Sequence, residues 1–186
     1  MFEELSIEML IFLIGAGFIA SFIDSVVGGG GLISVPSLMM TGLSPVVVLG
    51  TNKMAAFMGS ITSTVAFMRS GKVDLKLIKY LFPLSVIGSA LGVFTVRMIP
   101  PDFLKPIVVG MLVIVTIYSL MKKDWGENST YHGMNKKTAI LSGGVAFVLG
   151  FYDGFFGPGA GSFLLFAFLC IGFDFIMAAG NARALN

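Results

Sequence analysis

Four ionisable side chains stand inside long apolar stretches of this sequence. Two are acids, Asp24 and Asp153, and two are bases, Lys53 and Arg183. A charge at the centre of a bilayer costs about 2.5–3.5 kcal/mol on insertion scales. Such side chains are therefore expected to face the protein interior, a water-filled cavity or one another. Two cations beside one cavity favour the binding of an anion.

A cluster of glycines follows each acid, at Gly28 to Gly31 and at Gly157 to Gly161. Each glycine costs about 1 kcal/mol relative to alanine inside a helix, so a continuous helix through either cluster is not expected. Broken backbone at membrane depth occurs only where it is buried in protein or lines a cavity. A helix that begins after the break points free N–H groups and the positive end of its dipole into that cavity. We therefore predict two broken helices that suit an anion, with tight helix packing as the alternative.

The two clusters belong to a repeated pattern. One shift along the sequence relates four pairs of residues: Asp24 and Asp153, Gly28 and Gly157, Gly30 and Gly159, and Asn52 and Asn181. Each half then contains an acid, a glycine cluster, an apolar stretch and an asparagine near a cation, which is Lys53 in the first half and Arg183 in the second. A pair of repeats with interrupted helices is typical of secondary transporters. Another glycine pair, Gly88 and Gly92, is interpreted as helix packing with no site role.

The predicted site is a compact one for an oxyanion of the phosphate or sulfonate type, held by backbone N–H groups, two cations and neutral amides. Its predicted residues are Gly28, Gly29, Gly30, Gly31, Asn52, Lys53, Gly157, Gly159, Gly161, Asn181 and Arg183. The acids Asp24 and Asp153 help to break the helices, hold the cations or carry a coupling proton or cation, and the sequence does not choose among these roles. No cofactor or metal is expected, since one cysteine and one histidine cannot form a metal site.

These residues need membrane-spanning helices to position them. Hydrophobic types make up 56% of the 186 residues and charged types only 12%, about half the charge of a typical soluble domain. The composition predicts an all-α, multi-pass bundle in a bilayer, and a net charge of +2 gives no reason to expect a nucleic-acid partner. Spans of roughly 20 residues are expected near 7–27, 31–49, 51–68, 80–99, 103–121, 138–156 and 158–177. Whether the region from Ile7 to Met68 holds three spans or two, with a re-entrant first one, stays open.

Three regions follow from this pattern: a first transmembrane repeat over 1–121, a polar linker over 122–137, and the start of a second, incomplete repeat over 138–186. Lysines and arginines gather in the loop at 69–80 and in the linker. Because cytoplasmic loops carry an excess of these residues, both segments are expected in the cytoplasm and the N-terminus outside.

Other classes of function fit the residues less well. There is no G-x-x-x-x-G-K-[ST] motif for a phosphate-binding loop, and neither H-E-x-x-H nor G-x-S-x-G occurs to support an enzyme. A channel or a structural membrane scaffold, without saturable substrate binding, is the alternative to a carrier.

Three motifs, at 22–36, 50–53 and 150–163, resemble those of the TauE/SafE family of bacterial membrane proteins, the sulfite exporter permeases. The resemblance implies a multi-pass carrier of the bacterial inner membrane with duplicated halves. It also implies export of sulfite, sulfonates or related organosulfur anions, with both glycine clusters and both asparagine-cation elements on the family's repeated signatures. Members of this family are longer than this chain, so the resemblance implies a C-terminal truncation.

Overall fold

The computed structural model describes residues 6–121 and 136–186, and within them it contains eight helices and no strand. This confirms the predicted all-α architecture. The helices are α1 (Ile7–Val27), α2 (Gly31–Met39), α3 (Pro45–Arg69), α4 (Leu75–Arg97), α5 (Pro101–Met121), α6 (Lys136–Phe155), α7 (Ala160–Ile171) and α8 (Phe175–Leu185). The predicted linker at 122–137 lies outside the described residues, apart from the first two residues of α6.

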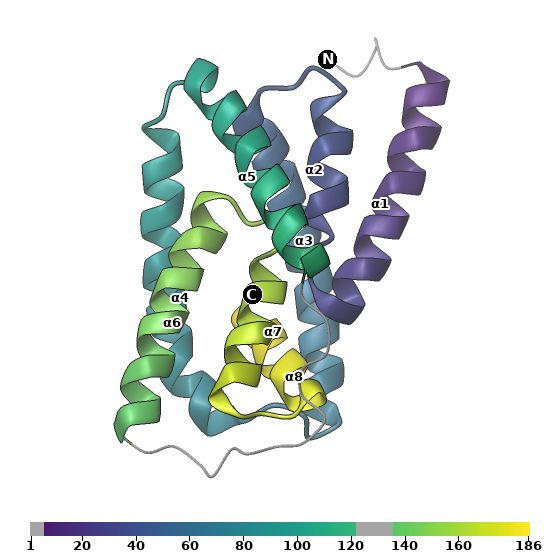
Figure 1. The fold of residues 1–186 in the computed structure, drawn as a ribbon. Coiled ribbons are helices and arrows are strands. Elements are labelled where there is room, and N and C mark those ends of the chain that lie inside the picture. The colour runs from purple at the N-terminus through teal and green to yellow at the C-terminus, as the bar shows by residue number, and fades with distance from the viewer. Residues whose placement is uncertain (1–5, 122–135) are drawn as a thin grey trace.

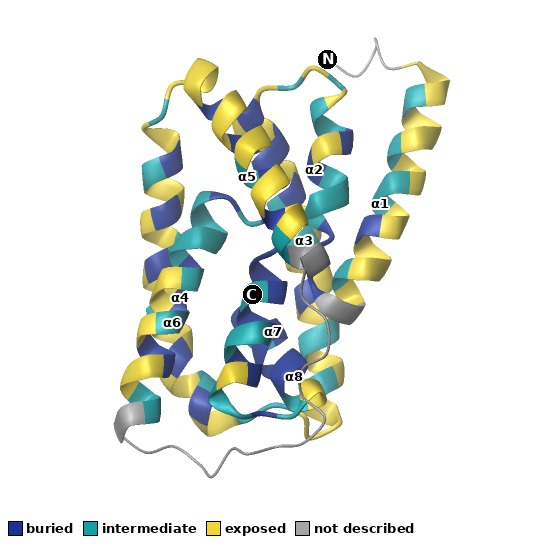
Figure 2. Ribbon diagram, viewed as in Figure 1, coloured by how far each residue is buried: buried dark blue, intermediate teal, exposed yellow. Residues whose placement is uncertain are grey.

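Four of these helices are long and apolar enough to cross a membrane, counting only the described residues. They are the segments Ile7–Ser25, Leu75–Arg97, Pro101–Tyr118 and Thr138–Phe155. Many large apolar side chains on them are exposed, such as Phe18 and Ile114 at 75% and 68%, which is the expected state of a surface that meets lipid tails. Figure 2 shows the opposite for α7 and α8, which are mostly buried at the centre of the bundle.

Both glycine clusters interrupt the helices where the sequence predicts. The first break lies between Val27 and Gly31, with Gly28 and Gly29 at φ values of 78° and 107°. The second lies between Phe155 and Ala160, with Gly157 and Gly159 at 94° and 81°. Positive φ is strained for every residue except glycine, so these residues allow the chain to reverse within a few positions.

The helices that follow the breaks are short, and three predicted spans are wrong for this reason. The expected spans 31–49 and 158–177 are not continuous: α2 ends at Met39, α7 ends at Ile171, and new helices begin at Pro45 and Phe175. With 9 residues, α2 rises only about 14 Å, about half of a hydrocarbon core of roughly 30 Å. The expected span 51–68 is the inner part of a longer helix, α3, which has no break at Gly50.

The two hairpins enter the bundle from opposite ends (Figure 1). In that view α1 descends from the upper end and α2 returns to it, whereas α6 rises from the lower end and α7 returns there. The turn of each hairpin lies near mid-height. An inverted repeat requires this arrangement, and the repeat itself stays a prediction.

Small residues bring α4 and α6 into close contact, as predicted for Gly88 and Gly92. A methyl group at Gly88 would overlap the carbonyl oxygen of Phe147, and one at Gly92 would overlap that of Phe151. Glycine at such positions lets two helix backbones approach closely. This contact fixes α6, and with it the second hairpin, against α4.

Candidate functional site

The turns of the two hairpins touch each other. Ser162 donates a hydrogen bond from Oγ to the carbonyl oxygen of Gly28 at 2.8 Å. A methyl group on Gly28 would lie 2.8 Å from the carbonyl carbon of Gly161, and one on Gly31 would lie 2.9 Å from the Cα of Pro158. The glycines therefore permit backbone-to-backbone contact between two segments far apart in the sequence, and the charged side chains gather around this junction.

Asp24 closes the N-terminal end of α2. Its Oδ1 accepts hydrogen bonds from the backbone N–H groups of Gly29 at 3.1 Å and Gly30 at 3.2 Å. A carboxylate at this position satisfies N–H groups that have no partner within the helix and also interacts favourably with the helix dipole. The N-terminal end of α2 therefore already binds an internal anion, which is the Asp24 carboxylate.

The other oxygen of Asp24 binds Arg183. The distance from Nη1 to Oδ2 is 3.0 Å, and the exposed fractions of the two side chains are only 4% and 18%. The second guanidinium nitrogen, Nη2, is buried without a hydrogen-bond partner. The ion pair thus holds the guanidinium in place while one of its nitrogens keeps unused donor capacity.

The second ion pair joins Lys53 of α3 to Asp153 of α6. Lys53 Nζ lies 2.5 Å from Oδ1 of Asp153 and donates to the backbone carbonyl oxygen of the same residue, also at 2.5 Å. The Lys53 side chain is 37% exposed, far more than that of Arg183. Each base is therefore paired with the acid of the other predicted half.

In the second hairpin, the Asp153 carboxylate does not cap the N-terminal end of α7. Pro158 stands at the position that corresponds to Gly29 and has no N–H group to offer a carboxylate. Its carbonyl oxygen instead accepts a hydrogen bond from the Tyr152 hydroxyl at 2.6 Å. Among the described residues, the structure gives no acceptor to the backbone N–H groups of Gly159 and Gly161. The N-terminal end of α7 therefore keeps N–H groups available for an anion.

A small polar cavity lies at the junction and has a volume of about 20 Å³, enough for about one water molecule. Nine residues predicted for the site or its charge balance line it: Asp24, Gly29, Gly31, Asn52, Lys53, Asp153, Gly157, Gly159 and Gly161. The structure thus brings together residues from both predicted halves in one cavity.

A larger cavity of about 580 Å³ adjoins the small one and shares several of its walls. Lys53, Asp153 and Asn186 line both cavities, and Arg183 lines the larger one. Apolar side chains such as Phe57 and Phe82 form much of the remaining wall. An anion with an apolar substituent could therefore place its charge at the junction and its substituent in the larger cavity.

Gly28 and Gly30 are the two predicted glycines that do not line the small cavity. Gly28 packs on Gly161, and a methyl group on Gly30 would lie 2.7 Å from the Cβ of Asp24. These two glycines shape the junction and do not line it.

Asn181, which the sequence places in the anion site, lines neither of the two cavities at the junction. It is completely buried, and its Oδ1 accepts a hydrogen bond from the backbone N–H of Asp74 at 2.8 Å. Asp74 caps α4, accepting from the N–H groups of Lys76 and Leu77, both at 3.1 Å. Asn181 therefore attaches α8 to the turn between α3 and α4.

Several polar residues around the junction are not among those predicted. The Ser34 hydroxyl donates to Oδ1 of Asn52, and Asn186 donates from Nδ2 to Ser60 Oγ at 3.3 Å. Tyr152 and Ser162, whose contacts are described above, stand directly beside predicted residues in the second motif. That adjacency is a usable sequence signal, whereas Ser34 and Ser60 resemble ordinary helical serines in the sequence.

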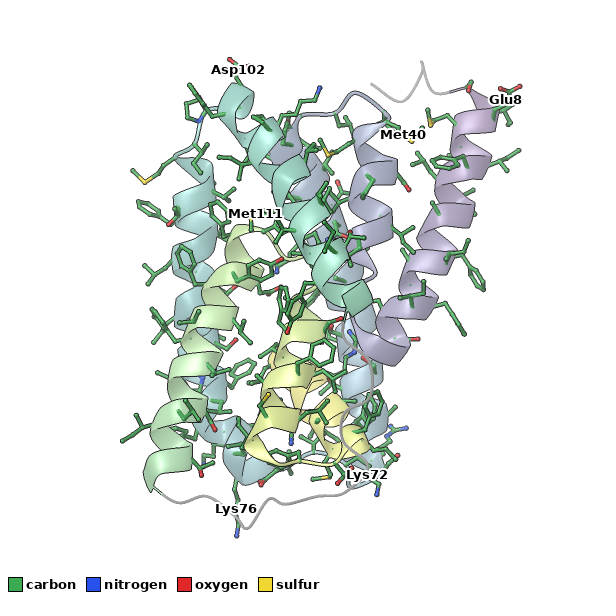
Figure 3. All side chains as sticks on the ribbon, in the orientation of Figure 1. Glu8, Met40, Lys72, Lys76, Asp102 and Met111 are labelled. Carbon is green, nitrogen blue, oxygen red and sulfur yellow. The ribbon has the colours of Figure 1, made fainter. Side chains whose placement is uncertain are left out.

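Charged side chains lie at both ends of the bundle, and Figure 3 labels four of them. Glu8 and Asp102 lie at one end, and Lys72 and Lys76 project from the other. Arg69 is in the last turn of α3, at the same end as the two lysines. The end with Glu8 and Asp102 also carries Arg97 in the last turn of α4 and Lys105 near the start of α5, and it is the end from which the first hairpin enters.

Comparison with known proteins identifies the family. The sulfite exporter TauE/SafE family matches residues 13–186. The chain is 35% identical over 185 residues to a probable membrane transporter protein, ORF9, of Sinorhizobium sp, which covers 99% of this chain and 70% of that protein. It is 36% identical over 184 residues to a probable membrane transporter protein of Haemophilus influenzae, covering 98% of this chain and 71% of that protein.

A third relative is the probable membrane transporter protein YfcA of Escherichia coli, 39% identical over 170 residues, which cover 90% of this chain and 62% of that protein. No solved structure matches the chain. The family and these relatives are named as membrane transporters and not as enzymes. By these matches, the chain belongs to the sulfite exporter TauE/SafE family of membrane transporter proteins.

Proposed function

We propose that this protein is a secondary transporter that exports sulfite, sulfonates or related organosulfur anions across the bacterial inner membrane. The observation that carries the proposal is the junction itself, where Lys53 and Arg183 meet the open N-terminal end of α7. The family's description supports sulfur chemistry and export. Because the chain spans about 70% of the first two relatives' lengths and 62% of the third's, the activity is proposed for the whole transporter.

The donors at the junction fit a compact oxyanion. Lys53 Nζ, Arg183 Nη2 and the N–H groups of Gly159 and Gly161 come from three different helices or their ends. Charge-assisted hydrogen bonds of this kind are about twice as strong as neutral ones. A tetrahedral or pyramidal oxyanion has three or more oxygens to accept from donors in several directions, whereas a halide offers one centre.

The charges at the two ends support an orientation. Lys72 and Lys76 lie at the end from which the second hairpin enters, and Glu8 and Asp102 lie at the other. Since cytoplasmic loops are enriched in lysine and arginine, we assign the lysine-bearing end to the cytoplasm. The first hairpin then enters the membrane from outside and the second from inside. The junction between their turns would be open to each side of the membrane alternately, as in other secondary transporters.

Uptake of labelled sulfite by proteoliposomes tests the proposal. The full-length transporter is reconstituted with unlabelled sulfite inside, and entry of ³⁵S-sulfite is measured against external sulfite concentration. A carrier gives saturable counterflow, and Lys53→Ala abolishes it because the exposed cation of the junction is lost. Lys105→Ala, at an exposed lysine of α5 outside the site, is the matched control and keeps full counterflow.

The same assay separates a carrier from a channel or a scaffold. Flux that rises linearly with sulfite concentration and ignores the internal anion would identify a channel, and no flux would identify a scaffold. Methanesulfonate, thiosulfate, sulfate, phosphate and small carboxylates in the internal solution then rank the accepted anions by the counterflow they drive. Saturable counterflow driven by carboxylates alone would overturn the sulfur assignment.

A further inference from the structure

The two cations of the junction are held very differently. We propose that the Asp153 carboxylate occupies the substrate's place on Lys53 and is displaced when the anion binds, whereas Asp24 stays on Arg183 throughout. The inference rests on the proposed function, because it concerns an anion at the same junction. It assigns Asp153 the role of a built-in competitor that sets the affinity of the site.

Asp24 is fixed by several contacts at once. Its Oδ1 accepts from two backbone N–H groups and its Oδ2 from Arg183. The Arg183 side chain is only 4% exposed, and removing one member of a buried ion pair costs about 3–5 kcal/mol. An incoming anion cannot easily replace Asp24, because it would have to satisfy the end of α2 and the arginine together.

Asp153 has weaker attachments. Among the described residues, its carboxylate contacts Lys53 alone, and Pro158 offers it no N–H group at the end of α7. Lys53 carries its charge on a flexible four-carbon stem and is 37% exposed toward the larger cavity. Lys53 and Asp153 both line that cavity, so an anion arriving through it reaches this ion pair and competes with one carboxylate for one cation.

The volume of the junction supports the exchange. The small cavity holds about 20 Å³, room for about one water molecule, which is too little for a sulfonate beside the carboxylate. Rotation of the Asp153 side chain away from Lys53 would vacate space between the ammonium and the open end of α7. The ammonium keeps its bond to the backbone carbonyl of Asp153, so it stays at the junction while its carboxylate partner changes.

The pairing of the charges, and not their sum, points the same way. The junction contains two acids and two bases, all of them paired. An anion that joined this set without displacing a carboxylate would have no unpaired formal charge to bind. An anion that replaces Asp153 on Lys53 gains a full charge partner, whereas the Asp153 carboxylate, 14% exposed, loses its own and depends on water in the larger cavity that it lines. Arg183 Nη2 and the N–H groups of α7 give the anion further donors that Asp153 does not use.

Substitution of each acid by its amide tests the proposal in the full-length protein. Dissociation constants for sulfite and for methanesulfonate are obtained in detergent from the dependence of the unfolding temperature on anion concentration. Asp153→Asn is expected to bind these anions at least about tenfold more tightly than the wild type, because Lys53 loses its internal competitor. Asp24→Asn is expected to show no tighter binding and to unfold at a lower temperature. Asp102→Asn, at an exposed acid on α5, removes the same charge elsewhere and leaves the affinity unchanged.

The outcomes separate the two proposals. Unchanged or weaker binding in Asp153→Asn, with normal binding in the wild type, overturns the competitor role and leaves the proposed function intact. Tighter binding in Asp24→Asn instead would show that the exchanged carboxylate is the other one. Binding of neither anion to the wild type or to any variant overturns both proposals. If Asp153→Asn fails to fold, two other variants decide the question. Asp153→Glu keeps the charge and should change the affinity for the anion, because it moves the carboxylate relative to Lys53. Lys53→Gln should fold and bind no anion.

Discussion

Arg183 near the end of α8 binds Asp24 in α1 across 159 sequence positions, with Nη1 and Oδ2 3.0 Å apart. A reciprocal pair, Lys53 and Asp153, joins α3 to α6. Each predicted half therefore supplies the acid for the other half's base. Two hairpins that meet at their turns, with their open ends at opposite ends of the bundle, produce such an exchange of partners.

Removing one member of the Arg183–Asp24 pair is expected to destabilise the protein strongly. Arg183→Ala leaves Asp24 without its cation in a site that is mostly shielded from water, so the free energy of unfolding should fall by about 3–5 kcal/mol. Thermal or denaturant unfolding in detergent measures this. The double variant Asp24→Asn with Arg183→Gln should lose less than the sum of the two single changes, because contacting residues are energetically coupled. Strict additivity would show that the pair contributes nothing as a pair.

Gly28 should tolerate no side chain. Gly28 has φ 78° and ψ 153°, a backbone region that is almost restricted to glycine, so Gly28→Ala adds a backbone cost of about 1–3 kcal/mol to a clash with the backbone of Gly161. Gly42 is the matched control, because it has a similar φ of 75° with nothing within 4 Å of an added methyl group. Gly42→Ala should therefore pay only the backbone cost and keep sulfite counterflow, whereas Gly28→Ala should lose it. Equal effects on stability and counterflow would mean that the contact between the hairpins is unimportant.

The α4 and α6 contact should depend on glycine. A methyl group at Gly92 would lie 2.6 Å from the backbone nitrogen of Phe155, so Gly92→Ala should destabilise the protein by at least about 1–3 kcal/mol, as overpacking does elsewhere. Gly110→Ala on α5 has open space around it and should be neutral or stabilising by up to about 1 kcal/mol. The difference between the two unfolding temperatures is the measurement, and a Gly92 variant as stable as the Gly110 variant would contradict the close packing.

Asn181 should matter for stability and not for binding. Asn181→Ala removes the acceptor of the part-buried Asp74 N–H group, and the free energy of unfolding should fall by about 1 kcal/mol, the net contribution of a typical hydrogen bond. The dissociation constant for sulfite should be the same as in the wild type once the folded fraction is taken into account. A large loss of affinity in a folded Asn181→Ala protein would return this residue to the anion site.

Much of the architecture is predictable from composition and from glycine. An apolar sequence with little charge requires a bilayer, and a bilayer requires backbone hydrogen bonds within each helix, so an all-α bundle follows. The breaks at both glycine clusters follow from the low helix propensity of glycine. The turns after α2 and α7 were not predicted although Gly42, Pro45, Gly172 and Asp174 are turn or capping residues. Each turn lies in a window of about 20 residues that is apolar enough to count as one continuous span.

The sequence by itself determined the membrane setting, the helical class, the two breaks and the four charges that a bilayer cannot leave unpaired. Only the tertiary structure decided which acid pairs with which base, that Asp24 closes α2 while α7 stays open, and that Asn181 faces the turn before α4 and not the junction. These outcomes depend on the directions and rotations of helices distant in sequence. Local composition fixes that a charge must be paired, but the partner is set by packing across the whole bundle.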